Sequence, residues 1–99
     1  HDYPLNTMPG DRWNGLVFGL KQCATCGKPL FVGEVGIKLA ALGGDKQRRA
    51  DFLAAKISTQ RAAGVVGHSV WAWSDPAQRL YEDYLVTSGD PLLDVLRTP

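Results

Sequence analysis

The residue best suited to chemistry in this sequence is Glu34, which lies in the apolar run KPLFVGEVGI at residues 28–37. Such a run predicts a buried β-strand, and a buried ionised carboxylate is costly unless another group pairs with it. Glu34 is therefore either a solvated charge at the exposed end of the strand or a residue kept there for chemistry.

Aromatic residues gather in a second apolar run, VVGHSVWAWSD, at residues 65–75. Alternate side chains of a strand share a face, so Trp71 and Trp73 lie together, while His68 lies on the other face. There we expect His68 to be hydrogen-bonded between strand and helices. If both runs are parallel strands, Glu34 and the tryptophans meet at the edge formed by the carboxyl ends. Aromatic rings stack on sugars and an acid can cleave them, so this grouping predicts a sugar-binding cleft.

Cys23 and Cys26 form the motif CATC. A structural zinc site needs four ligands, and the two histidines do not lie at zinc-finger spacing, so no metal site is predicted. A thioredoxin-type redox pair would open a helix, whereas this motif closes an expected helix. The favoured interpretations are a local disulfide in a secreted parent, or two inert thiols in a cytosolic one. Localisation stays open too; a secreted or cell-envelope parent is favoured only if the disulfide forms.

Helical and strand patterns alternate along the chain. Helices are expected at about 11–25, 46–63 and 91–97, and strands at about 28–37 and 65–73. Both strands are apolar on both faces, which is typical of parallel strands in an α/β fold whose sheet is covered by helices. Two such strands leave apolar edges unpaired, so the chain looks like a slice of a larger α/β fold.

Capping residues set the expected helix ends. Asp11, Asp45 and Asp90 stand where N-caps belong, and Gly27 stands where the first helix should stop. Trp13 falls on the apolar face of the first expected helix, so we expect it in the core.

The charge pattern gives no sign of a nucleic-acid or membrane partner. The 11 basic and 10 acidic residues give a net charge of +1 and are spread along the chain. Lys46, Arg48 and Arg49 cluster, but acidic residues flank them, so a solvated helix face is expected. No apolar run approaches the roughly 20 residues that span a bilayer. The chain starts at His1 rather than Met, so we expect a piece of a longer protein.

Three motifs follow one another along the chain: His1-Asp2-Tyr3, GKPLFVGEVG at 27–36 and VWAWSD at 70–75. In this order, with helices between them, they resemble the ends of the sixth, seventh and eighth strands of the cellulase and β-mannanase family. This is family five of the retaining glycoside hydrolases, and its members fold as (β/α)8 barrels. The resemblance covers residues 1–99 as the last three βα units of such a TIM barrel. Sister families of the same clan share much of this pattern.

The resemblance implies a role for each matching residue. Glu34 would be the catalytic nucleophile, and Tyr3 would donate a hydrogen bond to it. Trp71 would form the platform under the sugar and would be followed by a non-proline cis peptide. Further substrate contacts would come from His1, Trp73 and Asp75.

One catalytic group is missing from the chain. A retaining glycosidase needs two carboxyl groups about 5 to 5.5 Å apart, and the family's acid/base is a Glu that follows an Asn on the fourth strand. This chain contains no Asn-Glu dipeptide. We therefore expect a fragment of a hydrolase for β-linked polysaccharide or oligosaccharide, inactive alone, that requires no metal or organic cofactor. Its expected partners are the carbohydrate and the N-terminal part of the barrel or another chain.

Two rival functions stay open. The first is a non-catalytic barrel fragment, or pseudoenzyme, that binds carbohydrate or protein through the same aromatic rim. The second is a small redox protein that uses Cys23 and Cys26. Separately, the alternative to a platform role for Trp71 is ordinary core packing, since most aromatic residues in strands are core.

Overall fold

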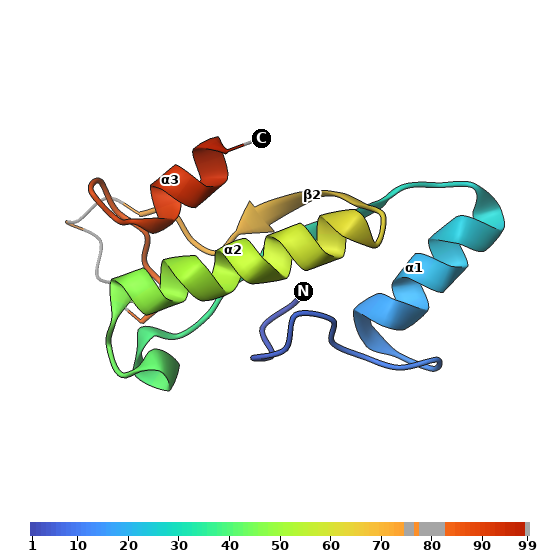
Figure 1. Cartoon of the computed structure of the whole chain (residues 1–99), viewed down its shortest axis with the longest axis horizontal. Helices are drawn as coiled ribbons and strands as arrows, with labels where there is room; N and C mark the ends of the chain where they lie inside the picture. The colour runs from blue at the N-terminus through green and yellow to red at the C-terminus, as the bar shows by residue number, and fades with distance from the viewer. Residues whose placement is uncertain (75–76, 78–82, 99) are drawn as a thin grey trace.

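The computed structural model describes residues 1–74, 77 and 83–98. They form a small mixed α/β arrangement in which parallel strands and helices alternate, as the sequence patterns predict (Figure 1). The observed bounds differ from the expected ones by a few residues. In chain order the elements are α1 (Gly15–Cys26), β1 (Leu30–Val35), the 3-10 helix η1 (Leu39–Leu42), α2 (Lys46–Ala62), β2 (Val65–Val70) and α3 (Leu92–Arg97).

The strands β1 and β2 pair in parallel, and their ends are extended by short bridges. Val35 pairs with Val70 of β2, and on the opposite side of β1 it forms a parallel bridge with Asp2. Beyond β2, Trp73 forms a parallel bridge with Val86. The first residues of the chain thus run beside the carboxyl end of β1, opposite β2.

The core lies between one face of this sheet and the helices α2 and α3. Val32, Val35, Leu53 and Leu92 are buried there. The expectation that the strands are buried on both faces is wrong for this chain. Phe31 of β1 and Val66 of β2 are both largely exposed, because α2 covers only one side.

The first helix begins later than predicted. The side chain of Asp11 accepts hydrogen bonds from the backbone amides of Trp13 (2.7 Å) and Asn14 (3.1 Å), which makes a turn before the helix rather than its cap. Trp13 therefore lies outside α1 and is exposed, so its predicted place in the core is wrong. The predicted stop is correct, since Gly27 adopts the left-handed conformation (φ 65°) that ends α1.

The other predicted caps form close to where they were expected. Asp45 accepts a hydrogen bond from the backbone amide of Arg48 at 3.1 Å and starts α2. Asp90 accepts one from the backbone amide of Leu92 at 3.0 Å, at the start of α3. Among the described residues, no helix combines the length and apolar character that crossing a membrane requires.

Candidate functional site

Three side chains meet at the carboxyl end of β1. The Tyr3 hydroxyl donates a hydrogen bond to Glu34 Oε1, and His1 Nδ1 lies 3.3 Å from the same oxygen. The Glu34 side chain is 21% exposed, so water or a ligand can reach it. The structure thus brings together three of the residues that the sequence motifs singled out.

An irregularity in β1 sets the direction of the Glu34 side chain. Between the pairs Val32–His68 and Val35–Val70, β1 has one residue more than β2. Val32 and Val35 consequently both face the core, although strict alternation would separate them. Glu34 is not among the buried core residues, and its carboxylate meets the Tyr3 hydroxyl.

Tyr3 is packed as well as hydrogen-bonded. The Tyr84 ring meets it edge to face, with 5.4 Å between centroids. A Cβ added at Gly36 would lie 2.8 Å from the Trp71 carbonyl oxygen and 3.1 Å from the Tyr3 ring, so only glycine fits there. Partial burial, followed by the hydrogen bond to Glu34, raises the pKa of Tyr3 well above its ordinary value. Tyr3 consequently stays a hydrogen-bond donor at neutral pH.

The two tryptophans occupy different positions at this end of the sheet. The Trp71 amide donates to the Val35 carbonyl at 2.8 Å, and the Trp71–Ala72 peptide is cis, as expected. Trp71 is half-buried, whereas Trp73 is 63% exposed. Asp75 lies outside the described residues.

The cysteines stand apart from this group, at the end of α1. Both are free thiols, so the disulfide considered for them is not formed. The Cys26 thiol donates to the Cys23 carbonyl at 3.5 Å. Their place at the C-terminal end of the helix also lacks the N-terminal dipole that activates a redox cysteine.

A buried polar network behind the site was missed in the sequence. Asp2 Oδ1 lies 2.6 Å from Lys56 Nζ, and Asp2 Oδ2 accepts from Gln60 Nε2 at 2.6 Å. Gln60 Oε1 contacts His68 Nε2 at 2.7 Å, which agrees with the predicted hydrogen-bonded place of His68. Burial, followed by the charge of Arg61, lowers the pKa of His68, so it is neutral near pH 7.

The expected solvated helix face is correct for Lys46 and Arg48, which are exposed, and wrong for Arg49. Arg49 is fully buried, and its Nη2 lies 2.5 Å from Asp90 Oδ2 and donates to the Leu85 carbonyl at 2.9 Å. A usable signal was present: Arg49, Lys56 and Gln60 lie at helical spacing from buried Leu53, on one face of α2.

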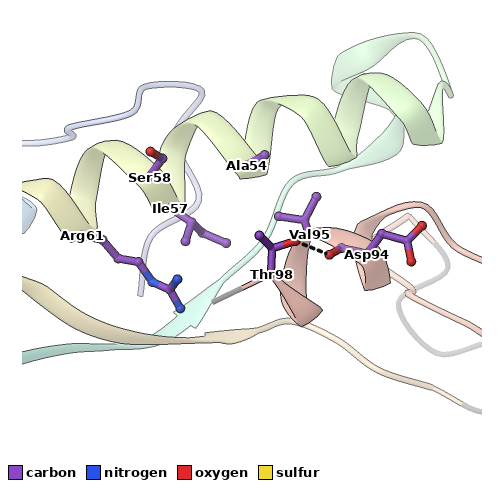
Figure 2. A pocket seen from close by; sticks show the side chains of 7 residues that line it. All are labelled: Ala54, Ile57, Ser58, Arg61, Asp94, Val95 and Thr98. Carbon is purple, nitrogen blue, oxygen red and sulfur yellow. Dashed lines mark hydrogen bonds between the residues drawn. The ribbon is translucent and has the colours of Figure 1, made fainter.

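Cavities lie beside the helices. Figure 2 shows the larger, of about 490 Å³, between α2 and α3, with Arg61 and Asp94 toward its two ends. None of the predicted site residues lines it. The second, of about 440 Å³, is lined by His1, Asn14 and Phe31 among others and borders the site.

Comparisons of the chain with protein-family models, curated proteins and solved structures found no match. Within residues 1–74, 77 and 83–98, no three His, Cys, Asp or Glu side chains come together as a metal site requires. The geometry around Glu34 is therefore the main indication of function.

Proposed function

We propose that this chain is the C-terminal part of a (β/α)8 barrel that hydrolyses β-linked oligosaccharide or polysaccharide with retention of configuration. The observation that carries the proposal is the contact of Tyr3 and His1 with Glu34 at the carboxyl end of a parallel strand. Barrel enzymes build their active sites at this end of their strands.

Glu34 would act as the nucleophile. One carboxylate oxygen attacks the anomeric carbon, the glycosidic C–O bond breaks, and a covalent glycosyl ester forms that water later hydrolyses. Tyr3 donates to Oε1 and so orients the carboxylate, which leaves Oε2 for attack. Because its pKa is raised, Tyr3 keeps the proton that this hydrogen bond needs.

The aromatic residues would bind the sugar. The largely exposed Trp73 ring offers a face on which a pyranose can stack, and Trp71 lies closer to the strand end of Glu34. His1 would contact a hydroxyl group of the sugar beside Glu34.

The general acid must come from elsewhere in the proposed barrel. The departing sugar oxygen needs a proton from a second carboxyl group about 5 to 5.5 Å from Glu34. The chain has no Asn-Glu dipeptide to supply it. We therefore expect that residues 1–99 do not hydrolyse ordinary glycosides unless an N-terminal part of the barrel or another chain adds that group.

A fluorosugar with a dinitrophenolate leaving group tests the nucleophile. Glu34 would form the ester bond to the anomeric carbon while dinitrophenolate departs as a stable anion, so no general acid is required. Fluorine beside the anomeric carbon slows hydrolysis of the ester and leaves the label in place. The experiment uses the complete polypeptide that contains this segment, with the 99-residue chain in parallel and peptide mass spectrometry to locate the label.

Labelling of Glu34 in the complete polypeptide, and its loss in Glu34→Gln, are the expected results. Labelling elsewhere, or none, would overturn the nucleophile assignment. The Tyr3→Phe variant should still label but more slowly, because the carboxylate loses its orienting donor.

Non-catalytic carbohydrate binding is the second candidate, and the exposure of Trp73 favours it. A protein of this kind would bind oligosaccharide in titration calorimetry but would never acquire the label. Binding that disappears in Trp73→Ala, together with an unlabelled Glu34, would select this function over hydrolysis.

A further inference from the structure

Helix α2 holds the start of the chain through three buried polar side chains, Asp2, Lys56 and Gln60, here called the Asp2 clamp. Asp2 is 4% exposed, and Lys56 and Gln60 are fully buried. Lys56 Nζ lies 2.6 Å from Asp2 Oδ1, and Gln60 Nε2 donates to Asp2 Oδ2 at 2.6 Å. Each oxygen of the Asp2 carboxylate thus has its own partner from α2.

The same two helix residues also hold the backbone that follows Asp2. Lys56 Nζ donates to the Pro4 carbonyl at 2.7 Å, and Gln60 Nε2 donates to the Thr7 carbonyl at 3.0 Å. Two side chains of one helix therefore fix the first seven residues at four points.

The Asp2 clamp is joined directly to the strand that carries Glu34. The Asp2 amide donates to the Glu34 carbonyl at 2.8 Å, and the Gly36 amide donates to the Asp2 carbonyl at 3.4 Å. In an extended segment neighbouring side chains point to opposite faces. With Asp2 turned toward α2, Tyr3 is turned to the other face, where its hydroxyl meets Glu34.

His68 fixes the orientation of the Gln60 amide. Because the amide nitrogen donates to Asp2 and Thr7, its oxygen faces His68 Nε2 and accepts a hydrogen bond from it. A flipped amide would place two acceptors, Gln60 Oε1 and Asp2 Oδ2, against each other. His68 thereby keeps Gln60 in the only orientation that holds Asp2.

We propose that Lys56 and Gln60 are positioning residues for the site, because through Asp2 they set the hydrogen bond between Tyr3 and Glu34. The catalytic meaning of this inference rests on the proposed function, but the positioning itself does not. A buried ion pair contributes little net stability compared with apolar packing, so stability alone does not explain the Asp2 clamp. The hydrogen bonds of the Asp2 clamp fix the position of the His1–Tyr3 segment.

The test follows Tyr3 by NMR in the 99-residue chain labelled with carbon-13 at the tyrosine ζ carbon. The Tyr3 signal is assigned by its loss in Tyr3→Phe, and its acidity is measured by raising the pH. The double variant D2N/K56M removes both buried charges, so neither is left buried without its partner. The groups that face Tyr3, Glu34 and Tyr84, stay in place, so a change reports the position of the segment.

The expected result is that the acidity constant of Tyr3 rises by about tenfold or more in D2N/K56M, one pKa unit being a tenfold change. The variant Q60A keeps the ion pair and should give a smaller rise. Leu53→Ala serves as the matched control, because it weakens the same face of α2 without touching Asp2. It should leave the acidity of Tyr3 unchanged.

Unchanged acidity in both folded clamp variants would overturn the positioning role, as would an equal rise in Leu53→Ala. Should D2N/K56M fail to fold, Q60A alone decides in the same way. Failure of the fluorosugar to label Glu34 would remove the proposed function but would not alter these titrations. The two proposals therefore fail separately.

Discussion

Replacing Lys56 by Met should destabilise this chain more than any change to its surface charges. The Lys56 side chain is fully buried and Asp2 is nearly so, with 2.6 Å between Nζ and Oδ1. Removing one partner of such a pair leaves a buried charge without compensation, which costs about 3 to 5 kcal/mol. A domain of ordinary stability has only about 5 to 15 kcal/mol in total, so much of the chain's stability would be lost.

The double variant D2N/K56M should recover most of this loss. It leaves no buried charge without a partner. The main interaction that it removes besides the ion pair is the hydrogen bond from Lys56 to the Pro4 carbonyl. Pro4 is exposed, so water can replace that bond. A typical intramolecular hydrogen bond contributes about 0.5 to 1.5 kcal/mol net, so the double variant should lie that far below the original chain. Urea unfolding followed by circular dichroism gives the free energies by linear extrapolation.

The exposed pair Arg97–Asp94, with 3.2 Å between Nη1 and Oδ1, is the matched control. Replacing Arg97 by Ala should change the free energy of unfolding by no more than about 1 kcal/mol. If Lys56→Met costs as little as Arg97→Ala, the Asp2 clamp is solvated in solution and the reasoning is wrong.

Three further predictions concern the site and its surroundings. Gly36→Ala should cost about 1 to 3 kcal/mol in urea unfolding, because its Cβ would overlap the Trp71 carbonyl, whereas Gly33→Ala, with open space around it, should not. Burial lowers the pKa of His68, so below pH 6.5 the unfolded chain takes up a proton that the folded chain resists; stability should fall from pH 7.5 to 5.5, and His68→Gln should flatten that slope. If the complete polypeptide is the proposed barrel hydrolase, Glu34→Gln should lower its turnover by orders of magnitude while calorimetry still detects oligosaccharide binding; near-normal turnover would refute the nucleophile role.

The features that sequence reasoning predicted depend on local chemistry. Asp45 caps α2 because its carboxylate reaches an amide three residues along, and Gly27 ends α1 because glycine tolerates a left-handed backbone. The parallel pairing of β1 and β2 follows from apolar runs separated by a helix. Each of these features depends on residues that are close together in the sequence.

The features that sequence reasoning missed depend on tertiary contacts or on one-residue shifts. An aspartate such as Asp11 can cap a helix or close a turn. Here Asp11 closes a turn before α1, so Trp13 lies at the surface and not in the expected core. The extra residue in β1 turns Glu34 away from the core, which no count of alternating residues foretells. The helical spacing of Lys56 from Leu53 could have indicated its face of α2, but its partner Asp2 lies far away in the sequence, so the buried ion pair could not be predicted from neighbouring residues.

The arrangement of α2 explains why polar residues are buried behind an apolar sheet. Leu53, which lies between Arg49 and Lys56 along the helix, is part of the hydrophobic core. Toward one end, Arg49 holds the Leu85 carbonyl beside Tyr84, and toward the other, Lys56 holds the segment that contains Tyr3. These two segments meet where the rings of Tyr84 and Tyr3 touch, next to the carboxylate of Glu34. Apolar contacts alone could cover the sheet with α2, but only directional bonds from the same helix can set the distance between those two segments.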